Sequence, residues 1–340
     1  VIELLREAGR VVGVRAEDTQ SGECFEFRSR AVARAVGAWT GRPARGSLRP
    51  LRGSHLLLPA WRLPVAHAIS FMHAADKRPV FVFPWEGATV VGTTDLDHQA
   101  SLDDEAVISQ AELDYLLAAC AQAFPSARVQ AQDVRSTWAG VRPVISQGDG
   151  QRNPSDEPRE HALWSEPGCV TLAGGKLTTF RLLALEVLRA CAPFVGRTVD
   201  DQGAATFAPV PSQPMPTLSP AQQKRLIGRY GRALPQLLAL LEELGVEQVA
   251  GTDTLWAELA WAAEQELVLH LDDLLLRRTR LGLLLACGAA AELPRIRVLC
   301  QARLGWDDAR WQEEEQAYRQ LWQRCYSLPA EDGSRGRTAS

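Results

Sequence analysis

Residues 170 to 181, Val-Thr-Leu-Ala-Gly-Gly-Lys-Leu-Thr-Thr-Phe-Arg, give the clearest local prediction in this chain. The apolar run predicts a strand, the glycines predict a turn, and Lys176 with the hydroxyl residues after it predicts the start of a helix. Gly174 and Gly175 let backbone N–H groups approach a ligand, and the unpaired amides of a helix N-terminus carry partial positive charge. The pattern predicts a site for an anion or an electron-rich ring, with an ordinary strand-to-helix turn as the alternative.

The composition is that of an ordinary globular protein. The chain has 340 residues, of which 46% are hydrophobic and 23% are charged. This length predicts about two domains at the usual size of roughly 150 residues each. The formal net charge of −4 provides no basic field, so we expect no nucleic-acid partner.

The cysteines and histidines show no metal-binding or disulfide pattern. Seven cysteines occur singly without a Cys-x-x-Cys pair, and the six histidines lack metal-ligand spacing. We therefore expect reduced thiols in a cytosolic compartment and no metal site. The apolar run 281–291 is shorter than the roughly 20 residues of a membrane span, so no transmembrane helix is expected. The chain begins with Val1 inside predicted structure and lacks a signal peptide, which indicates a fragment.

Alternation of apolar residues predicts an N-terminal β-meander over residues 11–36, with a turn near 20–22. Further strands are expected at 55–58, 80–83, 89–91 and 137–144, and a helix at 103–124. Closely spaced prolines between 199 and 220 indicate an extended linker. Beyond it, helical periodicity runs from 219 to 325, with Ser219 and Pro220 as N-cap and first helical residue.

Four short segments form an ordered set. They are Val36-Gly37-Ala38-Trp39, Arg52-Gly53-Ser54-His55, Gly140-Val141-Arg142-Pro143 and Gly174-Gly175-Lys176, with Pro84-Trp85-Glu86 and Val91-Gly92-Thr93-Thr94-Asp95 between the second and third. In this order they resemble the FAD-dependent glycerol-3-phosphate dehydrogenases that pass electrons to a respiratory quinone. The run from Leu271 to Arg280, which reads Leu-Asp-Asp-Leu-Leu-Leu-Arg-Arg-Thr-Arg, resembles a segment of that family's helical C-terminal domain.

One part of the family pattern does not occur in these residues. The family opens with a strand–Gly-x-Gly-x-x-Gly–helix unit that holds the FAD pyrophosphate. No such unit occurs in this sequence, and Arg34 stands where the family usually has asparagine. The resemblance therefore implies an N-terminally truncated member of the family, without about its first third.

The resemblance also implies the architecture, an α/β (α+β) fold. We expect part of an FAD/NAD(P)-binding flavoprotein domain, an antiparallel β-sheet substrate domain and an all-α C-terminal domain. The implied boundaries are 1–43 for a partial FAD-binding domain, 44–160 for the substrate domain, 161–200 for a return to the FAD-binding domain, 201–218 for a proline-rich linker, 219–328 for the helical domain and 329–340 for a disordered tail.

Three residues match the family's catalytic and substrate-binding positions. His55 lies beside the flavin by resemblance, and an imidazole suits removal of a hydroxyl proton as hydride leaves the adjacent carbon. The alternative for His55 is a strand histidine hydrogen-bonded within a sheet. Arg142 matches a substrate-site arginine, whose guanidinium can bind phosphate or steady an alkoxide. The alternative for Arg142 is a buried ion-pair partner.

Lys176, the third of these residues, is expected near the pyrimidine end of the flavin, where negative charge accumulates on reduction. The alternative is a solvated lysine. The implied FAD contacts are Gly37, Trp39, Gly174, Gly175, Lys176, Leu177 and Thr178. Thr93, Thr94 and Asp95 are interpreted as a structural turn, and Trp39, Trp85 and Trp138 as packing residues near the ligand.

Arg277, Arg278 and Arg280 lie beside a leucine-rich stretch. Such a cluster is typical of a solvated face or of pairing with acids such as Asp272 and Asp273. The functional alternative is docking to an anionic membrane surface.

The activity implied by the resemblance is oxidation of glycerol 3-phosphate to dihydroxyacetone phosphate with FAD, followed by electron transfer to a quinone. The resemblance also implies a cytoplasmic enzyme held peripherally on the inner membrane, and a homodimer. Two alternatives remain open. One is a glycerol-3-phosphate oxidase or related hydroxy-acid or amino-acid oxidase that uses oxygen, and the other is a non-catalytic remnant.

Overall fold

The structure is a computed structural model that describes residues 1–40, 47–146, 160–200, 203, 209–210 and 213–329. The chain divides into two compact units. Unit 1 comprises residues 1–53, 95–104 and 140–204, and unit 2 comprises residues 54–94, 105–139 and 205–340. The domain boundaries given above stay a prediction. The expected tail lies almost entirely outside the described residues, as does much of the expected linker.

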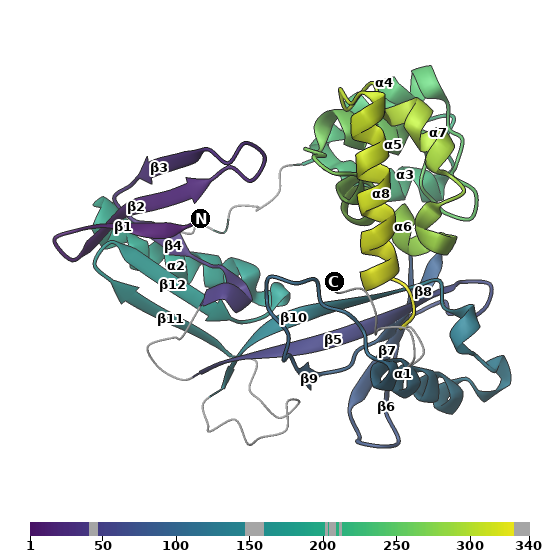
Figure 1. The fold of residues 1–340 in the computed structure, drawn as a ribbon, viewed down its shortest axis with the longest axis horizontal. Helices are drawn as coiled ribbons and strands as arrows, with labels where there is room; N and C mark the ends of the chain where they lie inside the picture. The colour runs from purple at the N-terminus through teal and green to yellow at the C-terminus, as the bar shows by residue number, and fades with distance from the viewer. Residues whose placement is uncertain (41–46, 147–159, 201–202, 204–208, 211–212, 330–340) are drawn as a thin grey trace, which may run out of the picture. The chain divides into compact units, whose positions relative to one another are not determined.

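Unit 1 contains an antiparallel meander of strands β1 (Glu3–Glu7), β2 (Arg10–Glu17) and β3 (Cys24–Arg28) (Figure 1). The predicted meander over 11–36 is therefore wrong at both ends. Strand β1 precedes it, and β4 (Val32–Arg34) leaves it to pair in parallel with β12. Local alternation identifies a strand, but the partner of that strand is set by packing far along the chain.

The second sheet of unit 1 has the order β11-β12-β4, with β11 at His161–Glu166 and β12 at Cys169–Gly174. Helix α2 (Phe180–Val195) lies beside this sheet (Figure 1) and buries Leu183 and Val187. The strand predicted before the glycine turn is confirmed. The turn itself lies between this strand and the helix that packs on the sheet.

A larger antiparallel sheet has the order β10-β5-β8-β7-β6, with β9 also paired to β5. Its strands are β5 (Ser47–Pro59), β6 (Ile69–Met72), β7 (Pro79–Trp85), β8 (Ala88–Gly92), β9 (Leu96–Asp97) and β10 (Ser136–Ser146). The strands predicted at 55–58, 80–83, 89–91 and 137–144 are confirmed. In the register of β5 with β8, His55 lies opposite Gly92.

Within unit 2, successive leucines of β5 belong to different cores. Leu56 and Leu58 belong to a cluster with residues of helix α1 (Gln110–Ala123), whereas Leu57 belongs to a cluster with the C-terminal helices. All three leucines are fully buried. This assignment follows from the two-residue period of a strand, whose side chains point alternately to opposite faces. Helix α1 begins at Gln110 rather than at 103, because Ser109 and Glu112 form a capping box.

The helices predicted beyond residue 219 are confirmed as a group in unit 2 (Figure 1). They are α3 (Pro220–Tyr230), α4 (Leu234–Leu244), α5 (Trp256–Gln265), a π-helix (Asp273–Arg278), α6 (Leu281–Leu284), α7 (Leu293–Cys300) and α8 (Asp308–Cys325). Ser219 caps α3 as predicted, with Pro220 as the first helical residue. Among the described residues, no helix is long and apolar enough to cross a membrane.

Candidate functional site

The turn after β12 requires glycine at two consecutive positions. Gly174 has φ of 76° and Gly175 has φ of 86°, both in the left-handed region. A Cβ atom on Gly174 would lie 2.5 Å from the carbonyl oxygen of Glu160, and one on Gly175 would lie 2.6 Å from Leu183. Backbone conformation and lack of space therefore both exclude larger residues from this turn.

Lys176 follows this turn and precedes a single 3-10 turn, Leu177–Thr179, with α2 starting only at Phe180. The sequence-based prediction of a helix starting at Lys176 is therefore wrong, because a 3-10 turn intervenes. Within the described part of the chain, the backbone N–H groups of Leu177 and Thr178 find no acceptor. The Leu177 side chain is 87% exposed, and Lys176 is exposed as well. Two backbone donors, a cation and an apolar side chain thus belong to consecutive exposed residues of one turn, a combination that suits a flat ring with an electronegative edge.

The segment Gly37–Thr40 forms another 3-10 turn in unit 1. Gly37 has φ of 60°, and the Trp39 side chain is 59% exposed. The indole N–H of Trp39 donates to Asp103 at 3.3 Å. Trp39 is therefore a surface aromatic residue with one polar contact, and a ligand ring could pack on its uncovered part.

Arg142 on β10 lies close to Gly53 within unit 1. A Cβ atom on Gly53 would overlap the guanidinium of Arg142, so that position has to lack a side chain. One guanidinium nitrogen of Arg142 lies 3.4 Å from a carboxylate oxygen of Asp95, and the two side chains are 30% and 4% exposed, respectively. Asp95, interpreted from sequence as a turn residue, is thus also an ion-pair partner. The guanidinium is held in place on one side and is partly accessible to a ligand.

His55 on β5 is hydrogen-bonded to an aromatic side chain from β10 within unit 2. The indole N–H of Trp138 donates to Nδ1 of His55 at 2.5 Å, and the ring centroids are 5.1 Å apart. Opposite His55 on β8, a Cβ atom on Gly92 would overlap the imidazole. The absence of a side chain at Gly92 therefore leaves room for the ring, and Trp138 orients it.

Trp138 in turn contacts Trp85 on β7, edge to face, with centroids 5.3 Å apart. The guanidinium of Arg280 lies over the Trp85 ring, 5.7 Å from its centroid. The neighbouring carboxylate, Glu86, pairs with Arg225 at 3.2 Å. A side chain of the helical segment therefore contacts Trp85, which in turn packs against Trp138, the hydrogen-bond donor to His55.

A buried carboxylate lies beside the strand that carries His55. Glu112 is 2% exposed and accepts hydrogen bonds from the hydroxyls of Ser54 at 2.8 Å, Thr94 at 2.7 Å and Ser109 at 2.9 Å. Burial on its own raises the pKa of Glu112, but the hydrogen bonds outweigh burial and the pKa is lowered. This carboxylate joins β5, the segment that follows β8 and the N-cap of α1.

The arginines of the 271–280 segment have partners inside unit 2. Arg277 pairs with Asp272 at 2.6 Å and with Asp273 at 3.0 Å. Arg278 donates to the carbonyl oxygen of Glu266 at 2.7 Å. The pairing with acids that the sequence suggested is confirmed for Arg277.

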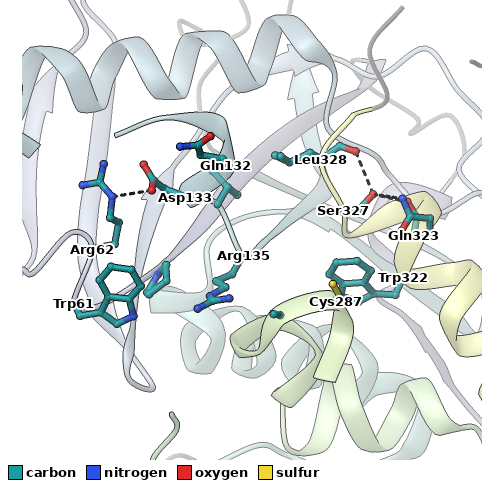
Figure 2. A pocket seen from close by; sticks show the side chains of 13 residues that line it. Trp61, Arg62, Gln132, Asp133, Arg135, Cys287, Trp322, Gln323, Ser327 and Leu328 are labelled. Carbon is teal, nitrogen blue, oxygen red and sulfur yellow. Dashed lines mark hydrogen bonds and ion pairs between the residues drawn. The ribbon is translucent and has the colours of Figure 1, made fainter. Parts of the chain in front are cut away.

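Unit 2 also contains a cavity of about 460 Å³ between the sheet and the C-terminal helices (Figure 2). Its lining includes Trp61, Arg135, Cys287 and Trp322. Arg62 and Asp133 also line it, and Figure 2 shows their ion pair, whose atoms are 2.7 Å apart. None of the site residues predicted from sequence lines this cavity, and we assign no function to it.

Sequence reasoning missed the roles of Gly53, Gly92, Asp95 and Trp138. Each of them lies within or near a quoted segment, but its role depends on a residue distant in sequence. Trp138 and His55 are 83 positions apart. A tryptophan two residues before the Gly-Val-Arg-Pro segment is the signal that could have drawn attention to it.

Comparisons with known proteins agree with this architecture. Residues 1–184 match the family described as FAD dependent oxidoreductase, and residues 171–311 match the family described as the C-terminal domain of alpha-glycerophosphate oxidase. The first match covers more than half of the 340 residues. The chain therefore belongs to the FAD-dependent oxidoreductase family.

Curated proteins with similar sequences include several named glycerol-3-phosphate dehydrogenases. An aerobic glycerol-3-phosphate dehydrogenase of Staphylococcus haemolyticus is 29% identical over 304 residues, covering 79% of this chain and 53% of that protein. A glycerol-3-phosphate dehydrogenase 2 of Mycobacterium tuberculosis is 30% identical over 307 residues, covering 83% of this chain and 52% of that protein. The chain thus spans about half the length of the curated relatives it matches.

A solved structure has the same fold. It is the glycerol-3-phosphate dehydrogenase from Bacillus halodurans complexed with FAD, with a TM-score of 0.74 and 23% sequence identity. The match covers 98% of this chain and 70% of that one. The predicted mixed α/β fold with a helical C-terminal domain is confirmed.

Proposed function

We propose that the protein containing this chain oxidises sn-glycerol 3-phosphate to dihydroxyacetone phosphate with FAD and passes the electrons to a respiratory quinone. The observation that carries the proposal is the similarity to proteins named glycerol-3-phosphate dehydrogenases over about 80% of the chain. The match of residues 171–311 to an alpha-glycerophosphate oxidase domain adds support from the helical segment.

The turn after β12 is compatible with FAD. Its glycines have no Cβ to keep a ligand from the backbone, and among the described residues the amides of Leu177 and Thr178 have no backbone acceptor. We assign FAD contacts to Gly37, Trp39, Gly174, Gly175, Lys176, Leu177 and Thr178. Bound FAD would accept the hydride from C2 of the substrate. The ammonium of Lys176 favours the negative charge of the reduced ring and so raises its reduction potential.

His55 and Arg142 are assigned to the substrate. Arg142 orients the anionic substrate: its guanidinium pairs with Asp95 and is 30% exposed, and a guanidinium can bind phosphate or an alkoxide. His55 acts at the C2 hydroxyl oxygen, and Trp138 orients its ring. The space left by Gly53 and Gly92 is required by these two side chains.

FAD titration and turnover test the proposal. The protein should bind FAD and reduce a quinone analogue with glycerol 3-phosphate as electron donor. Arg142→Met should raise KM at least about tenfold, since a hydrogen bond to a charged group contributes about 1.5 to 3 kcal/mol. Arg232→Met, at an exposed helical position, is the matched control. Absence of both FAD binding and turnover would favour the non-catalytic alternative.

Oxygen is the second candidate acceptor, and the match of residues 171–311 to an alpha-glycerophosphate oxidase domain favours it. Peroxide formed per substrate oxidised, measured with and without a quinone analogue, separates the two acceptors. A stoichiometric peroxide yield that quinone does not reduce identifies an oxidase.

Peripheral association with the cytoplasmic face of the inner membrane, and a homodimer, complete the proposal. Both follow from the family resemblance. Co-sedimentation with anionic vesicles at low and high salt tests the first, because attraction to charged lipids is screened by salt. Sedimentation equilibrium tests the second.

A further inference from the structure

We infer that Trp138 fixes the protonation form of His55, so that the neutral imidazole carries its proton on Nε2 and presents that N–H to the substrate oxygen. This inference rests on the proposed function for the presence of substrate at His55. The form of the ring itself follows from contacts within unit 2.

The direction of one hydrogen bond decides the form. An indole nitrogen is only ever a donor, so Nδ1 of His55 is the acceptor in its 2.5 Å contact with Trp138. A neutral imidazole has one protonated nitrogen and one acceptor nitrogen. The proton therefore lies on Nε2. Adding a second proton at Nδ1 would set two N–H groups against each other.

The position of Trp138 is itself constrained. Trp85 packs edge-on against it, and Arg280 covers the Trp85 ring. Arg280 ends the 271–280 segment, the part of the helical region that resembles the dehydrogenase family. This segment therefore supports His55 through two aromatic rings, which gives Trp138 and Trp85 positioning roles.

Two strands place uncharged residues against the His55 ring. Strand β8 presents Gly92 and strand β10 presents Trp138, neither of which carries charge. Beyond Trp85, the guanidinium of Arg280 pairs with the carboxylate of Glu86 at 3.9 Å, so opposite charges lie together there. The carboxylate of Glu112 on α1 accepts a hydrogen bond from Ser54. Ser54 precedes His55 on β5, so the side chains of these two residues point to opposite faces of the strand.

This form changes the role expected of His55. A ring protonated at Nε2 donates a hydrogen bond to the C2 oxygen and orients the hydroxyl, but it cannot accept a proton at that nitrogen. This hydrogen bond forms before hydride transfer, and no proton is transferred when it forms. General-base action by His55 would first require the bond from Trp138 to break.

Nitrogen-15 NMR of histidine-labelled protein, loaded with FAD, tests the form directly. His55 is assigned by comparison with His55→Gln. We expect Nδ1 to show the chemical shift of an unprotonated nitrogen and Nε2 that of a protonated one, from about pH 6 to pH 8. In Trp138→Phe the ring should titrate near the ordinary histidine value of about 6.5, whereas the control Trp61→Phe, at a 75% exposed indole, should leave the signals unchanged.

A protonated Nδ1 in the wild-type protein would overturn the inference, and so would ordinary titration of His55 there. The wild-type spectrum decides this even where Trp138→Phe fails to fold. Because the spectrum does not depend on turnover, failure of the proposed activity is seen separately, as an absence of product with glycerol 3-phosphate.

Kinetics give a second measurement. Glutamine keeps an amide N–H that can replace the Nε2–H donor, whereas leucine keeps none. We expect His55→Gln to retain a kcat/KM about tenfold higher than that of His55→Leu, the effect of one hydrogen bond. We also expect Trp138→Phe to introduce an acid limb near pH 6.5 into a kcat/KM profile that lacks it in the wild type. Equal losses in the two His55 variants, with that limb already present in the wild type, would identify His55 as a base.

Discussion

The guanidinium of Arg142 occupies the space in which a Cβ atom on Gly53 would lie. Because φ at Gly53 is not in the left-handed region, the backbone accepts alanine and only the space is lost. We expect Gly53→Ala to displace Arg142 and to lower kcat/KM for glycerol 3-phosphate about 10- to 100-fold, mainly through KM. Gly140→Ala, where a Cβ meets no atom within 4 Å, is the matched control. Equal kinetics in the two variants would remove Arg142 from substrate binding.

A Cβ atom on Gly92 would likewise overlap the imidazole of His55. Gly92→Ala should push the imidazole away from Trp138 and overpack the sheet, which destabilises the fold by about 1 to 3 kcal/mol. Urea unfolding and kcat/KM measure the two effects. Gly228→Ala on α3 meets no atom within 4 Å and should instead stabilise the fold by up to about 1 kcal/mol, because it replaces glycine in a helix. Unchanged activity in Gly92→Ala would contradict a fixed position for His55.

Lys176 is expected to act on the charge of the reduced flavin. Lys176→Met should lower the reduction potential of bound FAD, because a cation favours the reduced and more negative form. Spectroelectrochemical titration of the FAD-loaded protein measures this potential. Lys224→Met removes an exposed lysine of α3 and should leave it unchanged. The same potential in both variants would favour the alternative of a solvated lysine.

Glu112 makes the fold sensitive to acid. Its pKa is lowered from 4.5, because hydrogen bonds from Thr94, Ser109 and Ser54 outweigh burial, so its proton binds more weakly in the folded than in the unfolded state. The stabilisation is therefore complete above about pH 4.5 and is lost as the pH falls through the lowered folded value.

Urea unfolding of Glu112→Gln tests this dependence. At neutral pH we expect a loss of about 2 kcal/mol, and below pH 4.5 a smaller difference from the wild type. Glu242→Gln, exposed on α4, is the control and should follow the wild-type curve. A difference that stays constant with pH would show that the charge of Glu112 does not matter.

Arg225 forms an ion pair with a fully buried carboxylate. It lies 2.6 Å from Glu258, which is 0% exposed and also accepts from the hydroxyl of Tyr230 at 2.7 Å. Arg225→Met removes the nearer of the two arginines that pair with Glu258, since Arg229 remains at 3.7 Å, and should destabilise the fold by up to about 5 kcal/mol. Arg319→Met breaks an exposed pair with Glu315 on α8 and should change stability by less than about 0.5 kcal/mol. Similar thermal midpoints for the two variants would contradict this difference.

The elements that could be predicted from sequence have local causes. The strand at 55–58 is predicted by the apolar run of three leucines that ends at Pro59. The cap of α3 is predicted by Ser219 followed by Pro220. The sequence pattern predicts the start of α1 too early, because acidic residues before Ser109 resemble a first helical turn. The parallel pairing of β4 with β12 could not be predicted, because no local pattern specifies a partner so distant in the chain.

For the candidate site, sequence identified residues but not their partners. His55, Arg142 and Lys176 were found through short segments in a characteristic order. That Trp138 donates to His55, or that Gly53 gives space to Arg142, depends on the pairing of strands. The chemical form of His55 therefore could not be inferred from the type of residue alone.

The alternation of three leucines on β5 has a consequence for the folding of unit 2. Leu56 and Leu58 complete the hydrophobic core with α1, while Leu57 completes the core with the C-terminal helices. Loss of this strand would open both cores at once. The helical segment is therefore thermodynamically linked to the sheet, and the two should melt in a single cooperative transition although a stretch of chain rich in proline joins their sequences.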